Sequence, residues 1–391
     1  MANISELRKY YYQDIKKLIK KTVNKNKEVF LIANNLADER DVQSYFNKLR
    51  LISNNRSRIL AIYYNHLWEP ILKLANLIGL RNNKQEQNWL EQKDIENLLN
   101  LTDFEVITSQ KRMLLPVYIP FISSIINNYI AHIPLINKLC LTTYVVARPK
   151  SKSYKKLSVS IIVPARNESG NILKIPTSIP KFGKWQELIF VEGHSSDKTW
   201  EKISEITKKY NGPLRIRAYK QMGKGKADAV RLGFEHAKGD ILMIYDADRT
   251  VEPKDLKKFY NALAENRGEF INGSRLVYPM EKDAMRMLNK FGNKLFSFLL
   301  THILGQRFKD TLCGTKAFFR KDYLKFKRFK DDPFGDFELI FGAIENSLKV
   351  TEVPVRYKER VYGSTNISRF RHGLQLFKIT WLAFKKFKVL S

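Results

Sequence analysis

Two carboxylates separated by one residue follow an apolar run in the middle of the chain. Residues 241–245 are Ile-Leu-Met-Ile-Tyr, and Asp246 and Asp248 come directly after them. On an extended backbone, side chains two residues apart point to the same side, so both carboxylates can approach one ion. Carboxylate oxygens are what a hard divalent cation prefers, and such a cation can hold phosphates. The spacing predicts a metal site at a strand end, although a loop with two solvated acids fits the same residues.

Polar residues also follow two other apolar runs. Residues 158–163 are rich in β-branched side chains and are followed by Pro164-Ala-Arg-Asn-Glu168, and residues 187–192 are followed by Gly193-His-Ser-Ser-Asp197. Such runs are typical of buried parallel strands. Because ligands of open α/β sheets lie beyond the carboxyl ends of the strands, these clusters predict a nucleotide pocket.

Each cluster also has a structural explanation. Glu192 could bind a ribose or a base, or it could cap the following turn. Asp197 is better explained as the N-cap of the next helix, and His194 as a structural residue. Residues 223–226, Gly-Lys-Gly-Lys, open a helix whose N–H groups could cradle phosphate, although such pairs are also ordinary turns.

Composition narrows the class of protein and its partners. The chain has 391 residues, 44% of them hydrophobic, and 69 Lys and Arg against 39 Asp and Glu, which gives a net charge of +30. This excess predicts an anionic partner: nucleic acid, a phosphorylated substrate or an anionic membrane surface. Two cysteines and a charged start without a signal-like core favour a reducing, cytoplasmic setting. We find no run of 18 apolar residues, so no spanning helix is expected.

Residues 1–150 alternate between expected strands and helices, which predicts an α/β layer. The strand at 28–33, the strand at 58–64 and the late Tyr-Val-Val-Ala-Arg strand at 144–148 together resemble the C-terminal half of a class I methyltransferase that uses S-adenosylmethionine. Gly79 is the only glycine of this half. Since a cofactor loop needs glycine for its tight turn, we expect a degenerate domain without a cofactor site, joined by a linker at 151–157.

Taken in order, the motifs of residues 158–388 resemble those of family 2 glycosyltransferases with the GT-A fold. Within that family they are most similar to dolichyl-phosphate mannose synthases and bacterial polyprenyl-phosphate glycosyltransferases. The resemblance implies a Rossmann-like mixed sheet with helices on both faces for residues 158–366. The motifs that carry it are residues 163–168, 191–199, 225–229 and 246–248, then Gly273-Ser-Arg275, Asp310-Thr-Leu-Cys-Gly-Thr-Lys316, Gly335-Asp-Phe-Glu338 and 360–366.

The same resemblance assigns roles by position. Asp246 and Asp248 would bind Mg²⁺ or Mn²⁺, and Arg360 would reach a phosphate. Glu192 stands where the family usually has Asp, and residues 363–366 lack the Lys often found there. The donor, a UDP- or GDP-linked sugar, would be held by Pro164, Ala165, Asn167, Glu168, Glu192, Gly193, Lys226, Asp228 and Arg275.

The chemistry that follows is metal-assisted transfer with inversion. The nucleoside diphosphate gains charge as it leaves, and the metal and Arg360 would stabilise that charge. A lipid phosphate acceptor is already an anion, whereas a hydroxyl acceptor needs a general base. Asp310 and Asp336 are the candidates for that base.

Two segments suggest where a lipid acceptor would enter. Residues 284–305 form an expected helix with Leu295, Leu299 and Ile303 on its apolar face, which could equally be a core helix. Residues 367–391 form an expected basic, aromatic C-terminal helix suited to an anionic membrane. We find no nucleic-acid motif, so nucleic acid ranks second as a partner for this surface.

The sequence therefore predicts a peripheral glycosyltransferase that acts on a polyprenyl phosphate at the cytoplasmic membrane face. One alternative is transfer to a hydroxyl of a polysaccharide or glycolipid. Another is an inactive GT-A fold that serves as a basic membrane-binding module.

Overall fold

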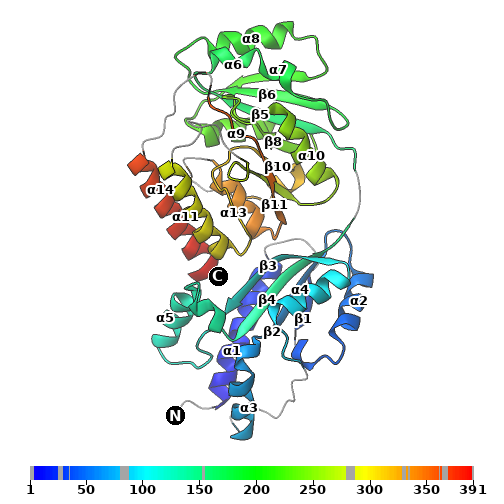
Figure 1. The fold of residues 1–391 in the computed structure, drawn as a ribbon, viewed down its shortest axis with the longest axis vertical. Coiled ribbons are helices and arrows are strands. Elements are labelled where there is room, and N and C mark those ends of the chain that lie inside the picture. Colours follow the sequence, from blue (N-terminus) through cyan, green and yellow to red (C-terminus); the bar gives the residue numbers. More distant parts are fainter. Residues whose placement is uncertain are drawn as a thin grey trace. The chain divides into compact units, whose positions relative to one another are not determined.

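The chain divides into two compact units. The computed structural model describes residues 4–24, 30–34, 36–79, 88–151, 155–278, 287–327, 332, 335–360, 362 and 369–389 (Figure 1). The N-terminal unit comprises residues 1–151 together with 302–306 and 382–391, and the C-terminal unit comprises residues 152–301 and 307–381. Each unit is described by itself.

The N-terminal unit is built on a four-stranded sheet of order β1-β2-β4-β3. Strands β1 and β2 are parallel, and β4 runs antiparallel to β2 and β3. The elements are α1 (Ile4–Asn24), β1 (Phe30–Asn34), η1 (Leu36–Asp38), α2 (Val42–Ile52), β2 (Arg58–Tyr64), η2 (His66–Trp68), α3 (Glu69–Leu77), α4 (Gln92–Leu101), β3 (Phe104–Arg112), α5 (Ile122–Asn128), η3 (Ile130–His132), η4 (Ile136–Leu139) and β4 (Thr142–Pro149).

Both faces of this sheet are covered, as the burial of β2 shows. Ile59 and Ala61 pack into one apolar cluster with residues of α2 and α4, and Leu60 and Ile62 pack into another with residues of α1. Alternate side chains of one strand thus enter two cores. The α/β layer expected from the sequence is present, with its strands where the apolar runs predict them. The resemblance of this unit to a methyltransferase stays a prediction.

The C-terminal unit is built on a mixed seven-stranded sheet of order β11-β9-β10-β8-β5-β6-β7. Its elements are β5 (Val159–Ala165), α6 (Ser169–Ile172), α7 (Ile175–Ser178), β6 (Gln186–Glu192), α8 (Thr199–Lys209), β7 (Arg215–Lys220), α9 (Lys226–His236), β8 (Ile241–Ile244), η5 (Pro253–Asp255), α10 (Leu256–Ala264), β9 (Phe270–Ser274), α11 (Met287–Leu304), β10 (Lys316–Phe319), α12 (Arg320–Tyr323), α13 (Phe337–Glu345), β11 (Val350–Pro354), α14 (Arg369–Phe384) and the π-helical turn η6 (Lys385–Val389).

The parallel part of this sheet brings the predicted polar clusters together. Strand β5 pairs in parallel with β6 and with β8, so the carboxyl ends of all three meet at one edge. Strand β10 runs antiparallel between β8 and β9. Helix α9 packs closely on β5, because a Cβ atom at Gly233 would stand 2.5 Å from a methyl carbon of Ile162.

Helix α11 differs from its predicted pattern. Leu295 and Ile303 were expected on one apolar face, open to lipid or packed in the core, and Asn293 on another; Leu295 is 42% and Ile303 6% exposed, whereas Asn293 and Ser297 are each 2% exposed. The polar pair is buried because Asn293 donates a hydrogen bond to Asp310. None of the helices within the described residues is both long and apolar enough to cross a bilayer.

Candidate active site

A pocket of about 420 Å³ opens at the carboxyl ends of β5, β6 and β8. Its walls come from the three loops that follow these strands, from the start of α9 and from Arg360. The lining residues are Pro164, Ala165, Arg166, Asn167, Glu168, Gly193, Gln221, Gly225, Lys226, Ala229, Asp246, Ala247, Asp248 and Arg360. Nine of the residues predicted for the site are in this set.

Asp246 is paired with the first residue of α9. The Lys226 ammonium lies 2.6 Å from Asp246 Oδ1. Burial acts to raise the pKa of Asp246, but the Lys226 charge outweighs it and the pKa is lowered. Gly314 makes room for the pair, since a Cβ atom there would stand 2.2 Å from Asp246 Oδ2 and 2.3 Å from Lys226 Nζ.

Asp248 is held from two sides. Its Oδ2 accepts a 2.7 Å hydrogen bond from Arg360 Nη2, and its Oδ1 accepts hydrogen bonds from the backbone and hydroxyl of Thr250. The Arg360 guanidinium also lies 3.8 Å from Glu168. The two carboxylates of the motif therefore each face one cation at the pocket.

Glu168 is buried and titrates near neutrality. Burial raises its pKa to about 7, although a hydrogen bond from Asn171 and the charge of Arg360 both act to lower it. Asn171 Nδ2 lies 2.8 Å from the carboxylate. A carboxyl group with this pKa is partly protonated at pH 7.

Gln221 is a pocket residue that motif reasoning did not select. It is 4% exposed, and its Nε2 donates to the carbonyl of Gly223 at 3.1 Å. That bond directs Oε1 elsewhere, and Oε1 has no hydrogen-bond partner within the described residues. A buried acceptor left unpaired carries a desolvation cost, and Gln221 is one of the residues that line the pocket.

Side chains singled out in the sequence analysis hold the loop after β6 by accepting hydrogen bonds from its backbone amides. Glu192 accepts a 2.5 Å hydrogen bond from the amide of Ser195, and Asn167 accepts one from the amide of Ser196. Asp197 accepts a hydrogen bond from the amide of Thr199, the first residue of α8, but the N-cap of this helix is Lys198 rather than Asp197. Glu192 does not line the pocket, so its capping explanation fits the geometry better than a direct base contact.

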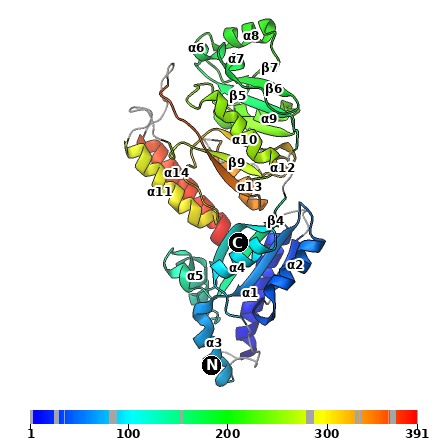
Figure 2. The same ribbon diagram turned by 45° about the vertical axis from the view of Figure 1, so that its right-hand side comes forward.

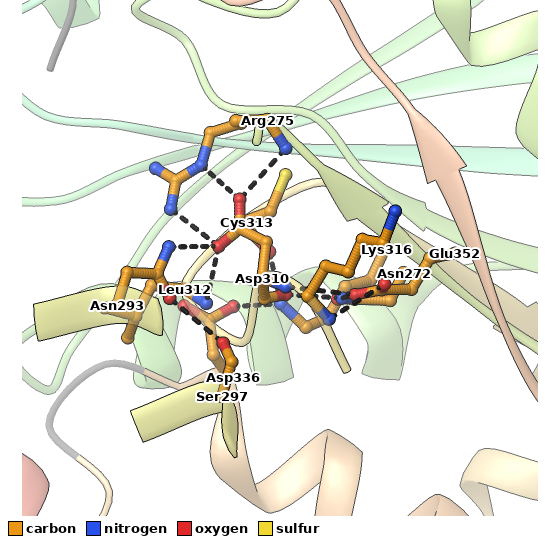
Figure 3. Close-up of polar contacts among 11 residues, drawn as sticks. Asn272, Arg275, Asn293, Ser297, Asp310, Leu312, Cys313, Lys316, Asp336 and Glu352 are labelled. Carbon is orange, nitrogen blue, oxygen red and sulfur yellow. Dashed lines mark hydrogen bonds and ion pairs between the residues drawn. The ribbon is translucent and has the colours of Figure 1, made fainter. Parts of the chain in front are cut away.

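Arg275 and Asp310 lie in a second cluster (Figure 3). Asp310 is fully buried and receives hydrogen bonds of 2.7 and 2.9 Å from the Arg275 side chain and of 3.0 Å from its amide. Asn293 on α11 adds one of 2.8 Å. Burial acts to raise the pKa of Asp310, but Arg275 lowers it overall.

The other predicted base is similarly engaged. The Lys316 ammonium is fully buried and lies 2.7 Å from Asp336 Oδ1. Asp336 stands at the start of α13 and does not line the pocket. Asp228 also lies outside the lining and is packed against Gly223. The predicted motif at 363–366 falls outside the described residues, although Arg360 before it is described.

The donor set at the pocket fits a cation that is shared with a ligand. Within the described ranges, no group of three or more His, Cys, Asp and Glu side chains is arranged to hold a metal. Mg²⁺ is nevertheless commonly bound by one or two carboxylates plus substrate phosphates and water. Asp246 and Asp248 fit that arrangement, with the remaining positions left to the ligand.

Comparison with known proteins agrees with this geometry. The family model described as Glycosyl transferase family 2 matches residues 160–326. Glycosyltransferase AglJ from Haloferax volcanii is 30% identical over 219 residues, which cover 55% of this chain and 68% of that protein. A dolichol-phosphate mannosyltransferase from Pyrococcus furiosus is 29% identical over 234 residues, or 57% of this chain and 64% of the relative.

A solved structure is also similar. Glucosyl-3-phosphoglycerate synthase from Mycobacterium tuberculosis, in complex with Mn²⁺, UDP and phosphoglyceric acid, superposes with a TM-score of 0.43 and 18% identity, covering 58% of this chain and 78% of that one.

The C-terminal unit has the GT-A fold and is a glycosyltransferase. More particularly, the chain belongs to glycosyl transferase family 2, and it spans about two thirds of the length of the curated relatives named above.

Proposed function

We propose that this chain is a metal-dependent, inverting glycosyltransferase that moves a sugar from a nucleotide donor to a polyprenyl phosphate at the cytoplasmic membrane face. The observation that carries the proposal is the pocket where Asp246 and Asp248 meet Lys226 and Arg360 at the carboxyl ends of three strands. That combination suits a diphosphate: two carboxylates for a cation, and two cations for phosphate oxygens.

The nucleoside of a UDP- or GDP-sugar would lie on the β5 and β6 side of the pocket. Pro164, Ala165, Asn167 and Gly193 line that side. The unpaired Gln221 Oε1 is suited to accept a hydrogen bond from a base N–H. Uracil and guanine both present such a group.

The diphosphate would lie between the loop after β8 and the start of α9. Mg²⁺ or Mn²⁺ held by Asp246 and Asp248 would neutralise charge on the leaving diphosphate. Lys226 and Arg360 are positioned to bind phosphate oxygens, and each would exchange its carboxylate partner for them. The residues of the chain would thus contribute to catalysis by placing charges next to the leaving diphosphate.

The ion pairs made by the two predicted bases favour a lipid phosphate as the acceptor. Asp310 is paired with Arg275 and Asp336 with the buried Lys316, which disfavours either as the base that takes a proton from a hydroxyl. A lipid phosphate needs no base, because it is already ionised. The name of the Pyrococcus furiosus relative includes dolichol phosphate, which supports the same acceptor class.

A hydroxyl acceptor is the second candidate, and one observation favours it. Glu168 lines the pocket with a pKa of about 7, which suits a general base at neutral pH. If Glu168 served as that base, Glu168→Gln would abolish transfer.

The proposed acceptor is tested by product mass. The protein is incubated with UDP- and GDP-sugars, Mg²⁺ or Mn²⁺, and either a polyprenyl phosphate or a neutral glycolipid. We expect a hexosyl-phosphopolyprenol product that persists in Glu168→Gln. A product formed only on the neutral glycolipid and lost in Glu168→Gln would replace this proposal with the second candidate.

A further inference from the structure

The N-terminal unit carries an apolar surface that its own core does not use. Residues 114–139 leave β3, form α5 and two short 3₁₀ turns, and return to β4. Seven apolar side chains of this stretch are strongly exposed: Tyr118 51%, Phe121 86%, Ile122 50%, Ile125 55%, Ile133 48%, Leu135 76% and Leu139 54%. Helix α5 stands off the sheet in both views (Figures 1 and 2). We call this stretch the 114–139 surface.

Two asparagines of the 114–139 surface bond to its backbone, whereas Ser124 and Lys138 are exposed. Asn127 Oδ1 accepts the amides of Leu114 and Leu115 at 2.9 Å, and its Nδ2 donates to the Leu115 carbonyl. Asn137 donates to the carbonyls of Lys111 and Ala131. These side chains satisfy the backbone from inside, so the segment is held in shape while its apolar side chains face out. That is the reverse of an ordinary surface loop.

The tip residue shows that this orientation is imposed by the backbone. Phe121 precedes α5 with a φ of 61°. A bulky side chain in the left-handed region is an outlier that carries a conformational cost. Here the conformation directs an aromatic ring to the outside, at 86% exposure, without any internal packing to repay the cost. Such strain is expected where the exposed ring has a partner.

Helix α3 extends the apolar surface. Trp68 Nε1 donates to the Leu139 carbonyl, and Asn65 Nδ2 donates to those of Lys138 and Cys140, so the start of α3 adjoins the end of the segment. On α3 and its flanks, exposed apolar residues recur at helical spacing. They are Leu67, Ile71, Leu74 and Ile78, between 46% and 60% exposed.

The charge around this surface is mostly basic, and Glu69 at the start of α3 is paired with Lys73. No acidic residue stands between Glu105 and Glu168, and none follows Glu359. Phe384, in the part of the C-terminal segment that belongs to the N-terminal unit, packs its ring against Tyr129 and His132. Lys385 and Lys386 follow it directly, and Lys138 is exposed within the surface itself. An apolar face with basic residues beside it matches an anionic bilayer.

We propose that the 114–139 surface and the outer face of α3 insert into the headgroup region of an anionic lipid bilayer and anchor the N-terminal unit there. The proposal deepens the membrane association proposed above, and it rests on that association for the choice of occupant. A protein partner fits less well, because protein interfaces carry about one hydrogen bond per 100–200 Å². Several backbone groups at the two ends of this surface are already bonded to Asn127 and Asn137, which leaves fewer of them for hydrogen bonds to a protein.

The test is co-sedimentation with vesicles, measured without donor or metal. Full-length protein is mixed with vesicles of phosphatidylcholine alone or with 30 mol% phosphatidylglycerol added. We expect binding to the anionic vesicles, and a loss of tenfold or more in the partition constant for Phe121→Asp/Ile125→Asp. Leu51→Asp is the matched control, because Leu51 is 86% exposed on α2, which lies on the other side of the unit from α5 (Figures 1 and 2).

Further variants test the same surface in case the first variant fails to fold. Leu135→Asp and Leu74→Asp change other exposed positions of the surface, so the proposal can still be tested in that case. Asp248→Ala should bind vesicles like wild type, which separates this surface from the transfer activity. Unchanged binding in all the surface variants would overturn the proposal. So would an absence of wild-type binding together with a dimer that Phe121→Asp/Ile125→Asp dissociates, because the occupant would then be a second copy.

Discussion

Asp246 and Asp248, two of the three acids that line the pocket, are each paired with a cation. Asp246 is paired with Lys226, and Asp248 with Arg360, which lies 112 residues further along the chain. Asp246 and Asp248 were selected from their place after a predicted strand, and Lys226 lies in the Gly-Lys start of a predicted helix. Arg360 was selected only from the family resemblance. Gln221 has no such signal: only its burial and its unpaired oxygen identify it.

Gln221 gives the first prediction. Gln221→Leu keeps the volume of the side chain but removes the acceptor proposed for a base N–H. Losing a neutral hydrogen bond costs about 1 kcal/mol, so we expect the Kd for the nucleoside diphosphate to rise about fivefold. Isothermal titration with UDP and GDP measures this. Unchanged affinity for both nucleotides would contradict a base contact, and Gln92→Leu on the exposed side of α4 serves as the control.

Asp310 gives the second prediction, which separates a positioning residue from a base. Asp310→Asn leaves the Arg275 guanidinium without its partner at a site where Asp310 is fully buried. Breaking such a pair costs roughly 3–5 kcal/mol, which urea unfolding would show. Adding Arg275→Met should restore part of that stability, because the stranded charge is removed.

The pH dependence of this pair has a defined sign. The pKa of Asp310 is lowered in the folded chain, so its stabilising contribution is present at neutral pH. The contribution declines as the pH falls below the ordinary pKa range of a carboxyl group. It is lost once the pH falls below the lowered pKa of Asp310. If Asp310 were instead the general base, Asp310→Asn would remove transfer and leave the free energy of unfolding unchanged.

At the scale of elements, the site depends on strands meeting at one edge. The sequence was sufficient to place β5, β6 and β8, because each is a short apolar run followed by polar residues. It could not show that β10 inserts antiparallel between β8 and β9 and brings the loop after Asp310 to the pocket. It also could not show which face of α11 is buried, since the Asn293–Asp310 contact that decides it is a tertiary one.

Gly314 carries the prediction at this scale. It lies in the loop before β10, and a Cβ atom there would collide with Asp246 and Lys226. We expect Gly314→Ala to lower kcat/KM for the sugar donor at least tenfold by displacing this pair, with a small change in the unfolding midpoint. Gly292→Ala is the matched control, because nothing lies within 4 Å of its Cβ position. Equal kcat/KM in both variants would show that the loop does not shape the site.

At the scale of the molecule, the boundary near residue 150 does not separate the units completely. Residues 302–306 and 382–391 belong to the N-terminal unit. There Thr108 donates to the carbonyl of Gly305 at 2.8 Å, and Lys388 is 6% exposed with burial lowering its pKa to about 7. The boundary near residue 150 was predicted from composition. Composition does not show that residues 302–306 and 382–391 pack with the N-terminal unit.

Removal of residues 1–151 is therefore expected to damage folding. The truncated chain would expose the residues of the C-terminal segment that pack in the N-terminal unit. We expect a lower soluble yield and a lower thermal midpoint than for full-length protein. A truncated chain with the full-length midpoint and full transfer activity would show that the first unit is dispensable.

The measurement closest to the central claim is sugar transfer in Asp248→Ala. With polyprenyl phosphate, a nucleotide sugar and Mn²⁺, we predict product from wild type and from Glu201→Ala, an acid exposed on α8. We predict none from Asp248→Ala, whose unfolding midpoint should stay near that of wild type, and none from wild type after chelation of divalent metal. Full turnover by Asp248→Ala in the presence of chelator would contradict the assignment of this pocket as the site of transfer.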